Sequence, residues 1–215
     1  MKKDKVRAQN KKINNVFYQI IRFFLKIFTL IVMSPKIINK HKVPKKGGVI
    51  LAGTHTGYLD TMCIGSTTLR PVHFVAKKEL MDKPVLGWIL RISGMISVDR
   101  KKKNPEAKSE ILETLESEQI VAIFPEGTIN RTKGEKEILP FKFGAVSFAQ
   151  KSGKPIIPFA IADAKAFNYH ARIILGDPFF VKKTDDLEVA NQRLEKKVIN
   201  LLREVKKYGK QQKKI

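Results

Sequence analysis

The stretch GVILAGTHTGYLD, residues 48–60, joins an apolar run to a histidine and an aspartate that lie five positions apart. The apolar run is short and bounded by glycine, which predicts a buried strand. On a regular helix, residues five positions apart would point about 140° away from each other. A strand, a turn at Gly57 and a helix that begins after it would instead let Asp60 fold back onto the ring of His55.

Short β-rich runs alternate with helical patterns through the rest of the chain. Strands are expected at residues 48–53, 72–76, 95–99, 120–124, 155–161 and 171–176. Helices are expected at residues 60–68, 85–92, 105–118 and 143–151, and again from 184 onwards. This alternation is typical of an α/β fold with a mostly parallel or mixed central sheet and helices on both faces.

The composition indicates one folded domain with an anionic partner. The chain has 215 residues, of which 43% are hydrophobic, and its 42 Lys and Arg against 20 Asp and Glu give a formal charge of +22. Such a charge favours nucleic acid, an anionic membrane surface or an acidic protein. The single cysteine, Cys63, excludes an internal disulfide, and its apolar neighbours predict burial.

The pair formed by His55 and Asp60 would suit general base catalysis. Asp60 would accept a hydrogen bond from one ring nitrogen and fix the tautomer, and the other nitrogen would take a proton from a substrate hydroxyl. A surface histidine followed by a helix-capping aspartate gives the same letters without that function.

Two further stretches place polar residues directly after apolar strands. They are GMISVDR, residues 94–100, and FPEGTINRT, residues 124–132. Ligands of open α/β sheets bind at the carboxyl ends of the strands, so His55, Arg100 and Glu126 should converge on one rim. Exposed amides and Arg131 in the second stretch would hold an anion there.

Four ordered blocks between residues 50 and 160 resemble the glycerophospholipid acyltransferase family. The blocks are His-x4-Asp at residues 55–60, Gly-x-Ile-x-x-Asp-Arg at 94–100, Phe-Pro-Glu-Gly-Thr at 124–128 and an apolar-Pro pair at 157–158. The resemblance implies transfer of a fatty acyl chain from a thioester of coenzyme A or acyl carrier protein to the free hydroxyl of 1-acyl-glycerol-3-phosphate. The product would be phosphatidic acid, and no metal or cofactor is implied.

The resemblance also implies roles for individual residues. His55 is expected to be the general base and Asp60 its orienting partner. The expected acceptor site consists of Arg100, Glu126, Gly127 and Thr128, with Lys77 or Lys78 from a similar basic stretch. Two positions depart from the family pattern, Thr54 in place of Asn and Ile129 in place of Arg. Arg131 is therefore expected to replace the missing arginine as a phosphate ligand.

Residues 1–35 are expected to form a basic tail and an amphipathic membrane-anchoring helix. Residues 16–33 are 18 residues long, about 27 Å as a helix, which nearly spans a bilayer. A transmembrane placement would cost roughly 2.5–3.5 kcal/mol for each of Arg22 and Lys26, so the helix should lie in the membrane plane with its polar stripe toward the headgroups. The alternative is a helix that packs on the domain's own core.

The polar stripe of the predicted N-terminal helix consists of Asn15, Gln19, Arg22, Lys26 and Thr29. The expected location is the cytoplasmic face of the cell membrane, as a peripheral or monotopic protein on an anionic surface.

The expected divisions are the N-terminal segment 1–35, an acyltransferase domain at 36–205 and a basic flexible tail at 206–215. One alternative is an acyltransferase for another acceptor, glycerol-3-phosphate or another lysophospholipid. A second is a non-enzymatic basic protein that binds membranes or nucleic acid. Nucleic acid is not expected, because the basic tracts lack interleaved aromatic residues and no helix-turn-helix or zinc-ligand spacing is present.

Overall fold

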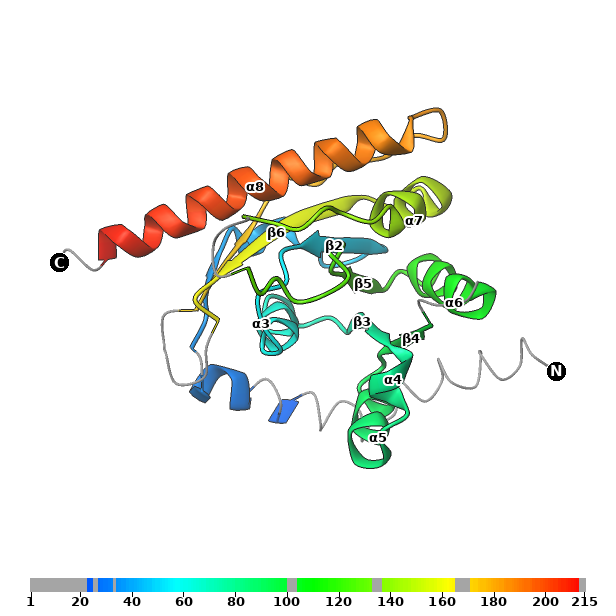
Figure 1. The fold of residues 1–215 in the computed structure, drawn as a ribbon, viewed down its shortest axis with the longest axis horizontal. Helices are drawn as coiled ribbons and strands as arrows, with labels where there is room; N and C mark the ends of the chain where they lie inside the picture. The colour runs from blue at the N-terminus through cyan, green and yellow to red at the C-terminus, as the bar shows by residue number, and fades with distance from the viewer. Residues whose placement is uncertain are drawn as a thin grey trace.

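The computed structural model describes residues 23–24, 27–32, 34–99, 104–132, 137–164 and 171–212. Within these residues the strands form one sheet in the order β1-β7-β6-β2-β5-β3-β4 (Figure 1). The strands are β1 Lys36–Ile38, β2 Val49–Gly53, β3 Val72–Lys77, β4 Ile96–Val98, β5 Ile120–Ile123, β6 Ile156–Ala162 and β7 Arg172–Leu175. The helices are η1 Lys40–Lys42, α3 Asp60–Gly65, α4 Lys78–Met81, α5 Pro84–Ile92, α6 Pro105–Glu116, α7 Gly144–Ser152 and α8 Leu187–Gln212.

The sheet is parallel except where β6 pairs with β7. The predicted mixed α/β fold is confirmed, and each of the six predicted strands is present within two residues of its expected bounds. The edge strand β1 and the short helix α4 were not predicted. Three residues in β1 and four in α4 are too few for a periodic signal.

Alternate residues of the central strands face two hydrophobic layers, as the side-chain period of a strand requires. Val49 and Leu51 pack with Cys63 and Ile64 of α3 on one face. Ile50, by contrast, belongs to the layer that α6, α7 and α8 cover on the other face. Figure 1 shows α3 on the opposite side of the sheet from these three helices. Helices therefore cover both faces, as predicted.

The carboxyl ends of β2, β5, β3 and β4 lie at one edge of the sheet, because these four strands are parallel neighbours. Helix α6 returns the chain to this sheet after β4, and Asn104 caps its first turn by accepting a hydrogen bond from the amide of Ala107 at 3.2 Å. Gly153 ends α7 in the left-handed region, with φ of 65°. The sequence predicted both helix boundaries.

Helix α8 packs along β6 and β7 and runs to Gln212. Leu194, Val198, Leu202 and Val205 are buried on this side. The helix continues for seven residues beyond the predicted domain end at 205. The three predicted divisions of the chain, with the flexible tail at 206–215, stay predictions.

Most of the predicted N-terminal helix, including Arg22 and Lys26, lies outside the described residues. Residues 27–32 are helical, with Thr29 and Val32 buried while Phe28 and Ile31 are exposed. Thr29, the one described member of the predicted polar stripe, therefore faces the protein, while Phe28 and Ile31 face outward. The in-plane placement of this helix stays a prediction. Among the described helices, none combines the length and hydropathy that crossing a membrane requires.

Candidate active site

His55 and Asp60 form a hydrogen-bonded pair at the carboxyl end of β2. Nδ1 of His55 lies 3.0 Å from Oδ2 of Asp60, which is the first residue of α3 and is fully buried. Asp60 also accepts hydrogen bonds from the amides of Thr56 and Gly57 and from the Thr56 hydroxyl. The strand, turn and helix thus fold the aspartate back onto the ring as the sequence predicts.

These contacts also occupy the backbone amides of the turn. Free amides at such a turn could otherwise stabilise an oxyanion during acyl transfer. In the structure the amides of Thr56 and Gly57 donate to Asp60 instead, the latter at 2.8 Å. They hold the carboxylate in place, so the oxyanion requires other donors.

The His55 ring is held from a second direction by Phe124. The two rings stack with centroids 4.0 Å apart and an interplanar angle of 16°. The His55 side chain retains 17% exposure, whereas that of Asp60 has none. Because Nδ1 is bonded to Asp60, Nε2 is the nitrogen available to a substrate hydroxyl.

Glu126 connects the glutamate loop, residues 124–132, to the histidine. Its Oε1 accepts from the amide of His55 at 2.8 Å, and its Oε2 accepts from the amide of Leu139 at 2.9 Å. The amide of Asn130 donates in turn to the His55 carbonyl at 2.8 Å. Burial raises the pKa of the Glu126 carboxyl, and the two hydrogen bonds oppose that rise. This geometry favours a positioning role over the acceptor contact expected from the sequence.

The rest of the glutamate loop lies beside the same turn. Gly127 has φ of 71°, a conformation that glycine adopts without strain. Thr128 and Arg131 are exposed, and Nη2 of Arg131 donates to the Tyr58 hydroxyl at 3.3 Å. Tyr58 belongs to the turn between His55 and Asp60, so Arg131 lies beside that turn. Its role as a phosphate ligand stays a prediction.

Lys142 is a cation at this loop that the sequence reasoning missed. A Cβ built on Gly127 would lie 3.1 Å from the Lys142 Nζ, so the ammonium group lies directly over the glycine. The backbone supports this placement, because the amide of Lys142 donates to the carbonyl of Pro125 at 2.9 Å. No signal in the sequence distinguished this lysine in a chain with 42 Lys and Arg.

For the other basic residues expected at the site, no contact with the turn between His55 and Asp60 is described. Lys77 is exposed at the end of β3 and pairs with Val98, so it lies at the same edge of the sheet. Lys78 is exposed and begins α4. Arg100 lies outside the described residues. Within the described parts of the chain, no three His, Cys, Asp or Glu side chains form a cluster that could hold a metal.

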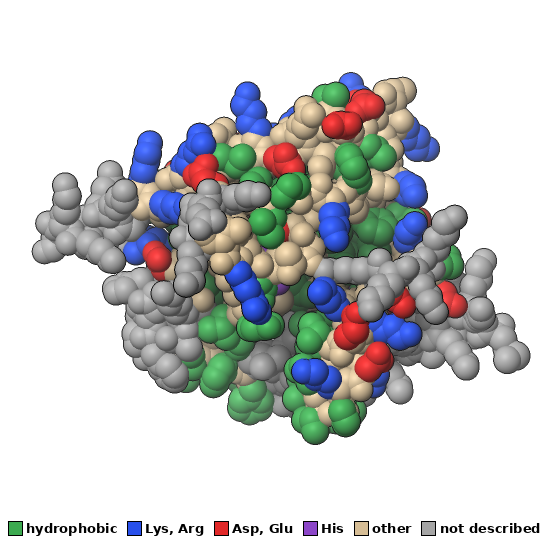
Figure 2. Space-filling view, viewed as in Figure 1, with side chains coloured by type: hydrophobic (Ala, Val, Ile, Leu, Met, Phe, Trp, Pro, Cys, Tyr) green, Lys and Arg blue, Asp and Glu red, His purple; other side chains and the backbone are tan. Residues whose placement is uncertain are grey.

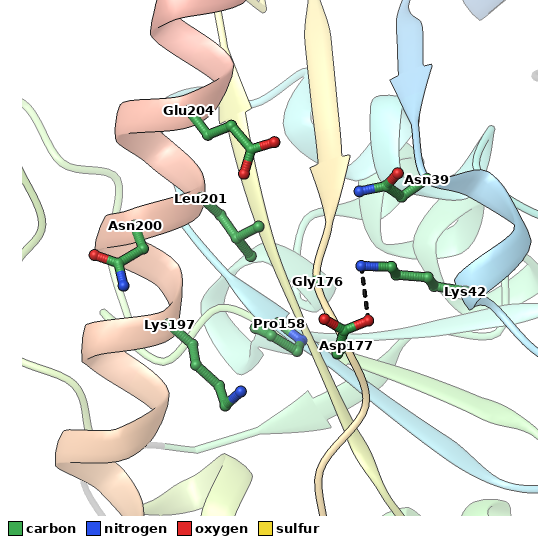
Figure 3. Close-up of a pocket in the computed structure, with 9 residues that line it drawn as sticks. All are labelled: Asn39, Lys42, Pro158, Gly176, Asp177, Lys197, Asn200, Leu201 and Glu204. Carbon is green, nitrogen blue, oxygen red and sulfur yellow. Dashed lines mark ion pairs between the residues drawn. The ribbon is translucent and has the colours of Figure 1, made fainter.

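A polar cavity of about 280 Å³ lies between the β6–β7 edge of the sheet and α8 (Figure 3). Two of its lining residues, Lys42 and Asp177, form an ion pair of 2.8 Å. Its walls share none of the residues of the histidine site; they consist of Asn39, Lys42, Pro158, Gly176, Asp177, Lys197, Asn200, Leu201 and Glu204.

A mainly parallel sheet that carries a hydrogen-bonded histidine–aspartate pair beside a basic loop is an arrangement suited to the activation of a hydroxyl group by general base catalysis. The chain belongs to the acyltransferase family, whose model matches residues 34–162. All four blocks of the predicted resemblance lie within this range.

Sequence relatives carry a more specific name. The chain is 33% identical over 144 residues to the 1-acyl-sn-glycerol-3-phosphate acyltransferase of Bacillus subtilis, covering 66% of this chain and 70% of that protein. It is 30% identical over 151 residues to the Saccharomyces cerevisiae enzyme of the same name, covering 68% of this chain and 47% of that protein. The chain thus spans about half the length of the yeast relative.

The fold is similar to that of a solved structure. The crystal structure of the 1-acyl-sn-glycerophosphate acyltransferase PlsC from Thermotoga maritima aligns with a TM-score of 0.64 at 19% identity. The match covers 92% of this chain and 97% of that one. This similarity supports the fold assignment.

Proposed function

We propose that this protein is a 1-acyl-sn-glycerol-3-phosphate acyltransferase. It transfers a fatty acyl chain from an acyl thioester to the free hydroxyl of 1-acyl-glycerol-3-phosphate and forms phosphatidic acid for phospholipid synthesis. The family assignment supports acyl transfer, and the names of the bacterial and yeast relatives support this acceptor.

The chemistry begins at Nε2 of His55. This nitrogen takes the proton of the acceptor hydroxyl as the oxygen attacks the thioester carbonyl. The new C–O bond gives a tetrahedral intermediate, whose collapse breaks the C–S bond and releases the thiol, with the imidazolium returning the proton to sulfur. Asp60 keeps the ring in the tautomer that leaves Nε2 unprotonated and stabilises the imidazolium between these two steps.

Glu126 acts through the position of His55. Its carboxylate is almost fully buried, with 4% exposure, and both oxygens accept backbone hydrogen bonds. Gly127, which is also buried, and Thr128, which is exposed, follow it on the loop. In this mechanism Glu126 fixes the loops, and the acceptor contacts come from other groups.

The acceptor phosphate binds where cations surround the glutamate loop. Arg131 lies beside Tyr58 and Lys142 lies over Gly127. A phosphate dianion is best held by several charged hydrogen-bond donors. Arg131 belongs to the loop itself, and Lys142 reaches it from a separate segment. Lys77, at the same edge of the sheet, and Arg100 are further candidates. Lys142 supplies a charge at a loop in which Ile129 carries none.

The proposed setting is the cytoplasmic face of the cell membrane, where the protein is peripheral or monotopic on an anionic lipid surface. The net charge of +22 supports this partner. The acyl donor is acyl-CoA or acyl carrier protein, since a basic rim attracts both of these anionic molecules. The reaction as written balances with these two substrates and needs no metal or cofactor, and no nucleic acid takes part.

The single observation that carries this function is the 3.0 Å contact between His55 and Asp60, with Glu126 bonded to the backbone of the same histidine. The test is identification of products by mass spectrometry. Purified protein receives paired acyl donors and a panel of acceptors: 1-acyl-glycerol-3-phosphate, glycerol-3-phosphate and lysophospholipids with larger headgroups. We expect phosphatidic acid from the first acceptor at the highest kcat/KM.

The matched variants are His55→Ala and His41→Ala. General base assistance contributes about 10²–10⁴ in rate, so His55→Ala should lose at least that factor while still binding lipid. His41 is an exposed histidine of η1, and its replacement should leave turnover unchanged. Highest turnover with another acceptor would overturn the substrate assignment, and normal turnover in His55→Ala would overturn the mechanism.

A further inference from the structure

Helix α5 presents an unpartnered apolar face to its surroundings. Val85 is 72% exposed and Trp88 is 56% exposed, and Leu86 and Ile89 are each 38% exposed. Hydrophobic side chains gather along the lower edge of the molecule in Figure 2, where α5 lies in Figure 1. Four large apolar residues within five positions of one helix form a patch of the kind that marks an interaction site.

The fold fixes the direction of this face. At 100° per residue, Val85, Leu86, Trp88 and Ile89 occupy one side of the helix, and Gly87 lies on the other. A Cβ on Gly87 would lie 2.0 Å from the Met81 carbonyl oxygen, so α5 packs closely against α4 at this glycine. That tight contact turns the apolar side away from the domain.

A second contact holds the helix pair together from the same side. Nη2 of Arg91 donates to the carbonyl of Met81 at 2.6 Å. Met81 is itself buried, so the polar contacts of α5 point inward while its large apolar side chains point outward. The exposed face is therefore a consequence of how the helix is anchored.

We propose that the apolar face of α5 inserts into the interfacial region of an anionic phospholipid bilayer. This inference rests on the proposed function, because an enzyme that modifies lipids acts at a bilayer. It assigns a membrane contact to the folded domain, in addition to the one expected for residues 1–35. Residues 77–92 carry four basic side chains and two acidic ones. Lys77, Lys78 and Lys83 are exposed beside the patch, which complements anionic headgroups.

Two further observations favour a bilayer over other partners. Tryptophan prefers the boundary between headgroups and acyl chains, and Trp88 lies within the exposed patch. The described N-terminal helical segments lie along the lower edge of Figure 1, and their residues Phe24, Phe28 and Ile31 are exposed. Two separate helical segments with exposed apolar side chains on one edge fit an extended lipid surface.

The position of α5 relates the proposed membrane contact to the active site. Helix α4 begins directly after the carboxyl end of β3, at the edge of the sheet that carries His55. Insertion of α5 would bring the bilayer to this edge of the sheet. A lysolipid acceptor could then reach His55 without leaving the lipid phase completely.

Trp88 is the single tryptophan of the chain and reports on this face directly. The full-length protein is mixed with unilamellar vesicles of equal parts phosphatidylglycerol and phosphatidylcholine, with or without brominated acyl chains. We expect a blue shift of the emission and quenching by the brominated lipid. Val85→Glu should lower vesicle partitioning about tenfold, because a buried apolar side chain is replaced by a charge.

The matched control is Val189→Glu, since Val189 is 64% exposed on α8, away from this face. It should leave partitioning and quenching unchanged. Circular dichroism checks that both variants retain the fold. Because vesicle binding is read without turnover, this test stands or fails separately from the assignment of substrate.

Three outcomes would overturn the proposal. One is binding to vesicles with Trp88 still emitting as a water-exposed group, which would assign membrane binding to another segment. Another is equal loss of partitioning in Val85→Glu and Val189→Glu. The third is a dimer in light scattering without lipid that Val85→Glu converts to a monomer, which would assign the face to a second copy of the chain.

Discussion

The backbone amide of His55 donates a hydrogen bond to the Glu126 carboxylate, although the two residues lie 71 positions apart. The amide of Asn130 donates back to the His55 carbonyl. The glutamate loop therefore forms hydrogen bonds with both the backbone N–H and the backbone C=O of His55. The position of the imidazole therefore depends on this long-range contact as well as on Asp60.

Replacing Asp60 with asparagine should reduce kcat strongly with little change in the acceptor KM. Oδ2 of Asp60 accepts from the ring of His55 and from the Thr56 and Gly57 amides, and an amide nitrogen at that position accepts none of them. Loss of the correct tautomer should lower kcat by about 10²-fold or more. Steady-state kinetics measure this effect, with Asp82→Asn on the exposed α4–α5 turn as the control. Unchanged kcat in Asp60→Asn would refute the orienting role.

Glu126→Gln should remove a pH dependence of stability. Burial raises the pKa of Glu126 above its ordinary value of 4.5. The folded state therefore binds this proton more tightly than the unfolded state, and the resulting stability is lost as the pH rises from the ordinary value through the folded pKa. A glutamine does not titrate, so the free energy of unfolding should fall less steeply across that range.

Urea unfolding at a series of pH values measures this slope. Glutamine also offers only one acceptor to the amides of His55 and Leu139, which should cost about 1–3 kcal/mol at neutral pH. Glu116→Gln on the exposed side of α6 should retain the slope of the native chain. Identical slopes in Glu126→Gln and the native chain would show that this carboxyl does not titrate in the expected range.

Lys142→Gln should weaken acceptor binding without changing the chemical step. A hydrogen bond from a charged donor contributes about 1.5–3 kcal/mol, so the KM for 1-acyl-glycerol-3-phosphate should rise roughly tenfold or more while kcat is retained. Kinetics with varied acceptor at fixed donor measure the change. Lys151→Gln, an exposed lysine of α7, is the matched control for loss of one charge. Equal effects of the two substitutions would indicate general electrostatics instead of a specific phosphate contact.

Gly53→Ala should destabilise the fold. An added Cβ would lie 2.0 Å from the Phe159 carbonyl oxygen and 2.6 Å from its ring, between β2 and β6. Overpacking of this kind costs about 1–3 kcal/mol. Gly65→Ala, at the end of α3, meets no atom within 4 Å and should be neutral or stabilising by up to about 1 kcal/mol. Thermal or urea unfolding compares the two variants, and equal stabilities would contradict the close approach of β2 and β6.

The sequence predicted the sheet and the His55–Asp60 pair because both depend on local patterns. The apolar strands are long enough to show their character, and the glycine turn lies between the two polar residues it brings together. The edge strand β1 could not be predicted from the sequence. Its three residues form a strand only by pairing with β7, which follows more than 100 positions later.

The contacts of Glu126 and Lys142 could not be predicted for a different physical reason. The partners of Glu126 are the backbone amides of His55 and Leu139, and every non-proline residue has such an amide, so the letters carry no mark of them. Lys142 is one of many lysines, and only the folding of its loop over Gly127 distinguishes it.

Thr29 faces the protein because tertiary packing, and not helical periodicity, decides which side of a helix is buried.

The stacking of Phe124 on His55 restricts how an alcohol can arrive. Phenylalanine covers one face of the imidazole at 4.0 Å, and the lone pair of Nε2 lies in the plane of the ring. In the proposed mechanism an incoming hydroxyl approaches Nε2 in the ring plane, on the side that Phe124 leaves free, while the proposed cations hold its phosphate. Mirror-image glycerol backbones would not satisfy both contacts equally, so we expect the enzyme to discriminate between enantiomers of the acceptor.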